Sequence, residues 1–217
     1  MCINWACFIS YPHGQGKLVN SFIVQLEEAL EDYLGPLLPH SVYMDKNRLN
    51  PGYNYDEALA KAICQSVCMI VVFSPRYTDS DYCLREFMAM EDIEEKRKQM
   101  LGDKFDKTRR MIIPIVIRGD QEDLPEKIKR IQYCDLSKFL LAGMNVTRKL
   151  EYNKSIDRIA KEIYKHYKSL KELHSKGLKE DCDSFILPSE KDARASWELR
   201  VTRPIGFPGR DFRNDIN

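Results

Sequence analysis

The sequence predicts an α/β fold in which a parallel sheet is covered by helices on both faces. Three features indicate this class. Short apolar runs typical of buried strands recur along the chain, amphipathic helical patterns lie between them, and turn residues join the two. Because strands alternate with helices through short connections, each crossover brings the next strand in parallel to the last.

The first predicted unit is one strand and one helix. Residues 5–11 form a mostly apolar run that ends at Pro12-His-Gly14, so we expect a buried strand followed by a loop. Residues 22–33 carry apolar side chains at helical spacing, and Gly35-Pro36 ends that helix.

The second unit is shorter. Residues 42–44 form a strand, and residues 45–52 follow it as a polar loop that ends in a Pro-Gly turn. Asn54, three residues before Glu57, predicts a capping box at the start of the second helix.

The middle of the chain contains the most apolar strand. Residues 67–73 are apolar throughout, as in a strand covered on both faces. A long helix is expected from about Ser80 into the charged run Glu94–Lys98, whose basic residues predict a solvated face. Residues 111–117 form a fourth strand, in which Pro114 marks a bulge or an edge-like position.

The end of the chain changes character. A short helix is expected from Pro125, a short fifth strand within residues 131–136, and a final helix over residues 156–170. We therefore place one domain at residues 1–175, and a C-terminal extension or partly ordered tail at 176–217. The tail has no helical or strand period, but two short apolar patches in it could dock on the domain or on a partner; they are residues 185–187 and 197–201.

Composition excludes several classes of protein. An apolar fraction of 43% and a charged fraction of 31% describe a globular chain. The net charge of +1 gives no field that would draw it to nucleic acid or to a membrane. No apolar run reaches the roughly 20 residues of a spanning helix, and no secretory signal is visible. We expect a cytoplasmic protein.

The cysteines fit the same compartment. The chain has seven, an odd number, without a C-x-x-C pair and with only four histidines to complete a metal site. Free cysteines within apolar runs behave as small buried hydrophobic residues. We expect reduced structural thiols, no disulfide framework and no metal.

Three segments, taken together, resemble the TIR (Toll/interleukin-1 receptor) domain family. Residues 8–11, Phe-Ile-Ser-Tyr, are similar to its first-strand box. Residues 45–52, with Asp45, Arg48-Leu49 and Pro51-Gly52, resemble the loop after its second strand, the BB loop. Residues 74–86, Ser-Pro-x-Tyr and then Ser-x-Tyr-Cys-x-x-Glu, are similar to its S-x-W-C-x-x-E motif. The similarity covers roughly residues 5–170.

The resemblance implies a flavodoxin-like sandwich with a five-stranded parallel sheet of order 2-1-3-4-5. It also implies one of two functions. Some members of the family are adaptors that assemble through TIR–TIR contacts, and others cleave the nicotinamide–ribose bond of NAD with the glutamate of the third motif. A bacterial subset makes cyclic or otherwise rearranged ADP-ribose signals in anti-phage systems such as Thoeris.

Glu86 is the candidate catalytic residue. Nicotinamide leaves as a neutral ring, so the reaction needs stabilisation of a positively charged ribose and control of the nucleophile, which one carboxylate can provide. Helix phase gives the opposite expectation. If Leu84, Phe87 and Met88 form the buried stripe, Glu86 lies nearly opposite its centre, as a solvated glutamate would.

Seven further residues are candidates for substrate binding. Phe8, Ser10 and Tyr11 end the first strand at the switch point of such a sheet, where the alternative for Phe8 is core packing. Arg48 could hold a pyrophosphate in a bidentate contact, and a plain surface arginine is the equal alternative. The remaining candidates are Asp45, Tyr82 and Cys83.

Two of these candidates, Tyr82 and Cys83, each have an alternative interpretation. Tyr82 stands where the family has tryptophan, and its aromatic ring can still cover a base of the substrate. Cys83 is expected to be core rather than a nucleophile, because no histidine lies nearby in sequence to activate it.

The leading hypothesis is therefore a TIR enzyme for which NAD is the substrate and no cofactor is needed. It would self-associate and make a signal for a separate effector in bacterial anti-phage defence. The alternatives are a non-enzymatic adaptor that assembles through residues 45–52, and an effector that depletes NAD.

Overall fold

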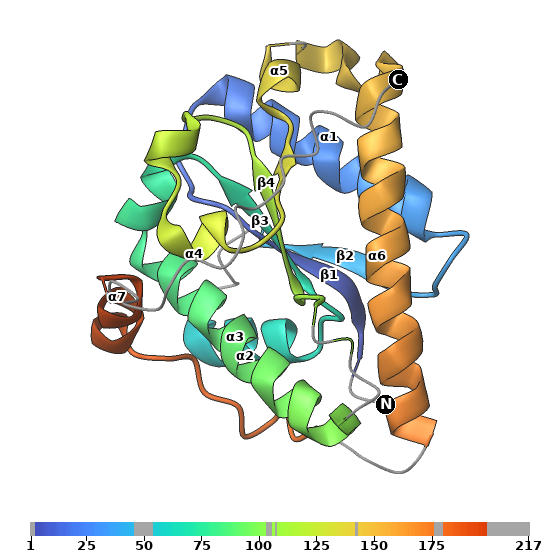
Figure 1. Ribbon diagram of the computed structural model, residues 1–217, viewed down its shortest axis with the longest axis vertical. Helices are drawn as coiled ribbons and strands as arrows, with labels where there is room; N and C mark the ends of the chain where they lie inside the picture. The colour runs from blue at the N-terminus through green and yellow to red at the C-terminus, as the bar shows by residue number, and fades with distance from the viewer. Residues whose placement is uncertain are drawn as a thin grey trace.

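The computed structural model (Figure 1) describes residues 3–45, 54–102, 106, 108–141, 143–175 and 180–198. Arg48 and the Pro51-Gly52 turn therefore lie outside the described residues. So does residue 199 onward, which includes the second half of the apolar patch at 197–201.

A five-stranded parallel sheet forms the centre of the molecule, in the order β2-β1-β3-β4-β5. This confirms the predicted α/β class and strand order. The strands are β1 (Trp5–Ser10), β2 (Ser41–Met44), β3 (Met69–Phe73), β4 (Ile112–Val116) and β5 (Cys134–Asp135).

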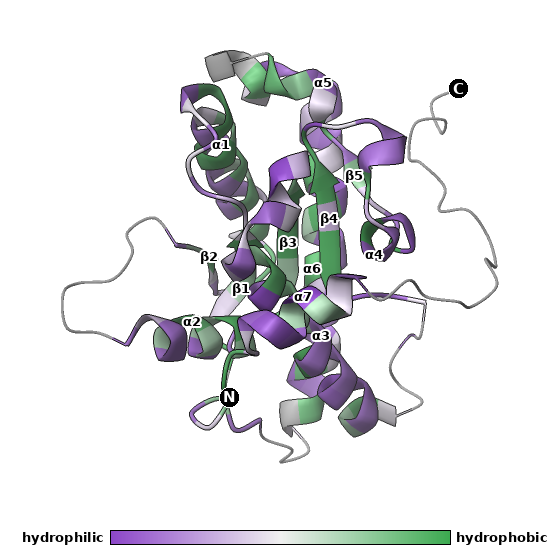
Figure 2. Ribbon diagram, turned by 90° about the vertical axis from the view of Figure 1, so that its left-hand side faces the viewer, coloured by the Kyte–Doolittle hydropathy of each residue, from purple (hydrophilic) through white to green (hydrophobic). Residues whose placement is uncertain are grey.

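Helices cover both faces of this sheet. In Figure 1, α1 and α6 lie on one side and α2 and α3 on the other, with α7 packed against α3. Figure 2 shows green apolar strands enclosed by helices that carry purple polar residues. The helices are α1 (Lys17–Leu34), α2 (Tyr55–Cys64), α3 (Asp81–Leu101), α4 (Glu126–Lys129), α5 (Ser137–Leu140), α6 (Leu150–Ser175) and α7 (Glu190–Glu198), and the 3₁₀ turns are Pro75–Asp79, Gln121–Asp123 and Gly143–Arg148. In the described residues, no helix is both long and apolar enough to span a membrane.

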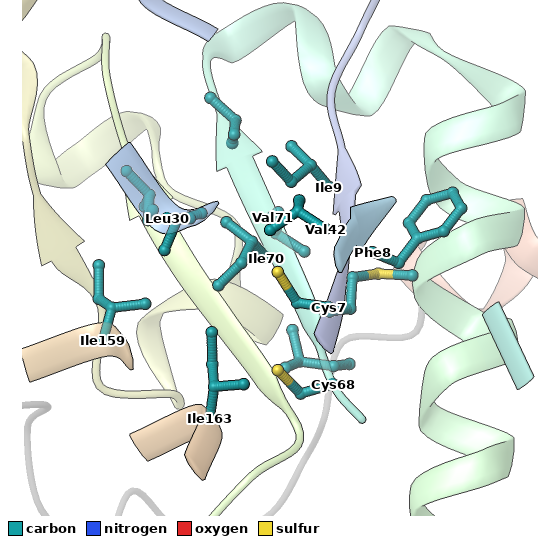
Figure 3. Close-up of a cluster of buried hydrophobic side chains, with 14 of the residues drawn as sticks. Cys7, Phe8, Ile9, Leu30, Val42, Cys68, Ile70, Val71, Ile159 and Ile163 are labelled. Carbon is teal, nitrogen blue, oxygen red and sulfur yellow. The ribbon is translucent and has the colours of Figure 1, made fainter. Parts of the chain in front are cut away.

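Strand β1 sends alternate side chains to the two faces, as a pleated strand must. Cys7 points toward the side of Ile159 and Ile163 of α6, whereas Phe8 points the other way (Figure 3). Ser10 shares the face of Phe8 by the same alternation, and its hydroxyl reaches α3. The sequence of β1 thus delivers one polar side chain to the α3 face, at the carboxyl end of the strand.

Pro114 occupies an edge-like position in β4, one of the two predicted alternatives. Ile117 donates to Phe73 of β3, so odd-numbered residues of β4 turn their amides to β3 and even-numbered ones to β5. On the β5 side the register begins only at Ile115. The N–H that Pro114 lacks therefore has no partner strand among the described residues.

The buried stripe of α3 differs from the expected one. The residues that face the sheet at helical spacing are Cys83, Glu86, Met90, Ile93 and Arg97, all buried. Leu84 and Phe87 are buried as well, and α7 covers α3 on another side, where Trp197 lies against Phe87. The helix-phase expectation of a solvated Glu86 is therefore wrong, because α3 is packed on more than one side.

The basic run of α3 is likewise only partly solvated. Arg97 is fully buried and donates to the backbone carbonyls of Cys64, Ser66 and Val67. Its charge is neutralised by Glu180, with Nε to Oε1 at 2.7 Å. Arg97 thus satisfies the carboxyl end of α2, where a positive charge is favourable.

The start of α2 is predicted correctly, but its cap is different. The helix begins at Tyr55 after Asn54, whose side chain caps no backbone amide. Instead, the Asn54 Nδ2 donates to the Glu57 carboxylate at 2.6 Å. The reciprocal capping box is therefore absent from this helix.

The expectation of reduced thiols throughout is wrong for one pair. Cys64 at the end of α2 forms a disulfide with Cys182, 118 residues later, while the described cysteines 7, 68, 83 and 134 are free and buried. The spacing of the cysteines in the sequence did not indicate this pair, because Cys64 belongs to the domain and Cys182 to the predicted tail.

Residues 180–198 of the predicted tail pack on the domain. Besides the disulfide, Lys61 pairs with Asp183 and Arg194 with Asp81. Leu187 is buried, so the apolar patch at 185–187 docks on the domain through this residue.

Candidate active site

Ser10 and Glu86 meet at the carboxyl ends of β1 and β3. Ser10 is the last residue of β1 and pairs with Val71 of β3, and β1 is the strand from which the chain crosses first to one side and later to the other. Ligands of open α/β sheets bind outside such switch points. Glu86 reaches this place from the second turn of α3.

A chain of hydroxyl groups holds the Glu86 carboxylate. Ser10 Oγ donates to Glu86 Oε2 at 2.6 Å and lies 2.8 Å from the Tyr77 hydroxyl. Tyr77 in turn can donate to the carbonyl oxygen of Cys83 at 3.2 Å. Only 6% of Glu86 and 1% of Ser10 are exposed, so the chain is shielded from bulk water.

Burial sets the protonation of Glu86. Desolvation raises the pKa of its carboxyl to about 8, the Ser10 hydrogen bond opposes that rise, and the negative charge of Asp45 adds to it. A buried carboxyl with a strongly shifted pKa at a switch point is typical of a functional acid or base. Near pH 7 it holds a proton when no substrate is present.

The hydroxyl chain can run in two directions. When Glu86 is ionised, Ser10 uses its single proton for the carboxylate, so Tyr77 must donate to Ser10. When Glu86 is protonated, it donates to Ser10, Ser10 to Tyr77, and Tyr77 to Cys83. Both states of Glu86 are therefore hydrogen bonded without moving a heavy atom.

Aromatic side chains and Asp45 form the wall beside this acid. Tyr82 is partly exposed and its ring meets Tyr55 edge to face, with centroids 5.2 Å apart. Tyr55 donates to Asp45, which is buried just after β2. The guanidinium of Arg85 lies over the Tyr82 ring, 5.4 Å from its centroid.

Arg85 connects this wall to the tail. Its Nη2 contacts Asp56 of α2 at 2.6 Å, and its Nε donates to the carbonyl of Pro188 at 2.7 Å. Trp197 of α7 packs near the Tyr77 ring, with the two ring centroids 6.1 Å apart. The tail thus contacts both Arg85, which holds Tyr82, and Tyr77 of the hydroxyl chain.

Tyr11, at the start of the loop after β1, lies near this acid. Tyr11 is half-buried and stacks on His13 with centroids 4.8 Å apart. Burial raises the pKa of its hydroxyl, and the charges of Asp45 and Glu86 contribute. The tyrosine therefore lies within electrostatic reach of both carboxyls.

The same loop is tied to the end of β3. Gln15 accepts a hydrogen bond from Ser74 at 2.7 Å, and Arg76 donates to the carbonyl of Gly14. Gly14 and Gly16 have φ angles of 76° and 92°, which L-residues with side chains rarely adopt. These contacts hold the loop after β1 next to the segment that follows β3.

The structure thus brings together Ser10, Tyr11, Asp45, Tyr82 and Glu86 of the predicted site. Phe8 has no exposed surface and stacks on Tyr43 at 5.2 Å, which matches its alternative of core packing. Cys83 is also buried, and burial raises the pKa of its thiol, so it is a poor nucleophile.

Sequence reasoning missed three residues of this neighbourhood. Tyr77 stood within the Ser-Pro-x-Tyr box and was not given a role. Tyr55 stood among the apolar positions of α2, and Arg85 was not considered. The box itself was the signal for Tyr77; nothing local in the sequence indicated that Arg85 would meet Pro188.

Comparison with known proteins decides the family. A family model described as TIR domain matches residues 7–145 of the chain. The chain belongs to the TIR domain family. The match includes Ser10, Tyr77 and Glu86, so the hydroxyl chain and its acid lie within the TIR domain.

A curated TIR relative comes from the plant Brachypodium distachyon, where it is named probable 2′ cyclic ADP-D-ribose synthase BdTIR. It is 30% identical over 93 residues, which cover 42% of this chain and 40% of the relative. A solved structure described as the activated Roq1 resistosome recognising the effector XopQ (TIR domains) is 19% identical, with a TM-score of 0.41 over 79% of this chain and 98% of that one.

Proposed function

We propose that the protein cleaves the nicotinamide–ribose bond of NAD and transfers the ADP-ribosyl group to water or to a hydroxyl of the same molecule. The observation that carries this proposal is the buried Glu86, held by Ser10 at the switch point of the sheet. Family membership and the name of the Brachypodium relative support the same reaction.

The chemistry suits a single carboxylate. The C–N bond breaks with its electron pair going to the nicotinamide nitrogen, which leaves neutral, while positive charge develops on the ribose. The ionised Glu86 stabilises that charge and then accepts the proton of the attacking hydroxyl or water. A base with a pKa near the working pH performs this transfer well.

The substrate itself supplies the reason for Glu86 to ionise. The nicotinamide ring of NAD is a cation, and a positive charge beside a buried carboxyl lowers its pKa. A protonated Glu86 in the free protein therefore loses its proton as NAD binds. Tyr77 and Ser10 then both turn their hydroxyl protons toward the new charge.

The aromatic wall gives the substrate its position. Tyr82 is exposed enough to contact a ring of NAD, while Tyr55 and Arg85 hold it from two sides. Tyr11, which interacts electrostatically with Asp45 and Glu86, would lie beside the substrate, and Asp45 can accept a hydrogen bond from a ribose hydroxyl. Arg48, which remains part of the proposal, would meet the pyrophosphate.

The wider role follows the resemblance and is also a proposal. The product would be a cyclic or modified ADP-ribose that a separate effector senses, and the protein would act as a TIR–TIR assembly in bacterial anti-phage defence. The curated relative is a plant protein, so this biological setting rests on the three sequence boxes alone.

The test is nicotinamide release from NAD by the concentrated protein, followed by mass spectrometry of the product. We expect turnover in the wild type, loss of at least a hundredfold in Glu86→Gln, and full activity in Glu95→Gln, an exposed glutamate of the same helix. Equal turnover in Glu86→Gln, or none in the assembled wild type, would overturn the proposal. Retention of biological function by Glu86→Gln would favour the adaptor.

A further inference from the structure

A concave site lies beside the amino-terminal half of β4, away from Glu86. It is a cavity of about 370 Å³ between that strand, the turn after α4 and helix α6. Its wall on the sheet is made by Ile112 and Ile113, at the amino end of β4, whereas Ser10 ends β1 at the carboxyl edge. The cavity and the proposed active site are therefore at opposite ends of the parallel sheet.

The cavity follows from the short β5. This strand has two residues and pairs only with Ile115 and Val116, so on the side of β4 that faces away from β3 its first three residues have no strand beside them among the described residues. The chain before β5 runs past this gap instead, and α6 closes it from one face. A volume of several hundred Å³ lies in the range that small ligands occupy.

Four arginines from three separate segments line this space. Arg109 and Arg110 precede β4, Arg130 follows α4, and Arg158 comes from α6. One acidic residue, Glu162, is in the same lining. Convergence of four guanidinium groups on one cavity is unlike a solvated helix face, where charges of both signs alternate.

Acidic residues orient the two arginines that precede β4. Arg110 contacts Glu94 at 2.6 Å and Glu91 at 3.6 Å, and Arg109 contacts Asp106 at 3.2 Å and Glu162 at 3.9 Å. Each guanidinium has five N–H donors, and one carboxylate engages at most two of them. These ion pairs orient the arginines and leave donors for an anion.

The inner wall is neutral. Burial raises the pKa of the Cys134 thiol, against the effect of the nearby Arg158, and burial lowers the pKa of His166. Four isoleucines supply an apolar surface; they are Ile112, Ile113, Ile131 and Ile159. The site thus combines a basic rim with an apolar floor, which suits a ligand that is anionic at one end and flat at the other.

We propose that this cavity binds a nucleoside monophosphate, or a nucleotide of similar size, with its phosphate on the arginines and its base on the isoleucines. Arginine pairs with phosphate oxygens in bidentate contacts, and this geometry favours a phosphate over a single-point anion. This site goes beyond the proposed NAD cleavage and does not depend on it.

The test measures binding of AMP by isothermal titration calorimetry at low salt. Arg109 and Arg130 are the positions to change, because both are accessible enough for substitution without emptying the core. We expect Arg109→Gln with Arg130→Gln to weaken AMP binding at least tenfold, and Glu162→Gln to tighten it. The matched control is Arg148→Gln with Lys149→Gln, two exposed basic residues outside the lining.

Further arms separate the two sites and the ligand class. AMP binding should persist unchanged in Glu86→Gln, which places it outside the proposed active site. Adenosine and inorganic phosphate should each bind at least tenfold more weakly than AMP. Binding that is unchanged in the double arginine variant, lost in Glu86→Gln, or matched by inorganic phosphate would overturn the proposal.

Discussion

Ser10 Oγ donates a 2.6 Å hydrogen bond to Glu86 Oε2 across 76 positions of sequence. The first residue ends a strand and the second lies in the second turn of a helix, so only the folded sheet brings them together. Because this bond stabilises the charged carboxylate, it controls the pH range in which Glu86 can act.

Replacement of Ser10 by alanine should move the pH dependence of the reaction. The substitution removes the interaction that opposes desolvation, so the pKa of Glu86 rises above its present value of about 8. We expect nicotinamide release at pH 7 to fall at least tenfold and to recover partly at pH 9. A loss that is equal at both pH values would show that Ser10 only supports the packing.

The wild-type protein should show a related pH profile. In the free protein Glu86 gains its charge as pH rises through about 8, so kcat/KM for NAD should rise up to that pH and then level off. The bound pyridinium cation lowers the pKa of the carboxyl. The corresponding rise of kcat with pH should therefore occur at a lower pH than the rise of kcat/KM. Coincident limbs for kcat and kcat/KM would contradict this account.

Glu86 should also make the folded protein less stable as pH rises. Its pKa is raised from 4.5 to about 8, so between these values the unfolded chain releases a proton that the folded protein keeps. The free energy of unfolding then falls by about 1.4 kcal/mol per pH unit from this group, and is level above pH 8. Glu86→Gln should abolish that slope.

Urea unfolding of both proteins at pH 5 and pH 8 checks this prediction. Other titrating groups are common to the two proteins and cancel in the difference. We expect similar stability near pH 5 and a more stable Glu86→Gln variant at pH 8. If the difference in the free energy of unfolding between the wild type and Glu86→Gln is the same at both pH values, Glu86 does not titrate in this range.

The Cys64–Cys182 disulfide should stabilise the domain through a long closed loop. Its 118-residue separation corresponds to about 5 kcal/mol by loop-closure entropy. We expect Cys182→Ala to lower the free energy of unfolding of the oxidised protein by 2–4 kcal/mol, a range typical of such bonds. Reductant should destabilise the wild type and leave the variant unchanged. A wild type insensitive to reductant would contradict the bond.

Tyr82 should contribute to NAD binding through its ring. Tyr82→Ala removes the partner of Tyr55 and Arg85, so we expect KM for NAD to rise at least fivefold. Tyr82→Trp, which restores the residue of the family motif, should keep KM within twofold of the wild type. A similar KM for the alanine variant would remove Tyr82 from the site.

Sequence reasoning captured the sheet because β1, β3 and β4 are apolar in nearly every position, as strands covered on both faces must be. It failed for α3, since Glu86 and Arg97 interrupt the stripe that faces the sheet. Polar residues in a buried stripe are visible only through their partners, and Ser10 and Glu180 are far away in sequence.

The contacts of the tail could not be predicted from the sequence for the same reason. Arg85 meets the backbone of Pro188, and a carbonyl oxygen has no signature in sequence. Cys64 and Cys182 likewise form a disulfide only because residues 180–198 pack against α2 and α3. The family boxes indicated Glu86 as the candidate acid where helix periodicity did not, because a motif describes several residues of a site together.

Pro114 bears on whether another chain can pair with the uncovered edge of β4. An open strand edge with a full row of N–H donors is a template for another chain, and proline is one of the residues that blunt it. The half of β4 that β5 leaves uncovered carries Pro114 on its outward side, so its row of donors is broken. Pro114 therefore disfavours the pairing of a second chain with that part of β4.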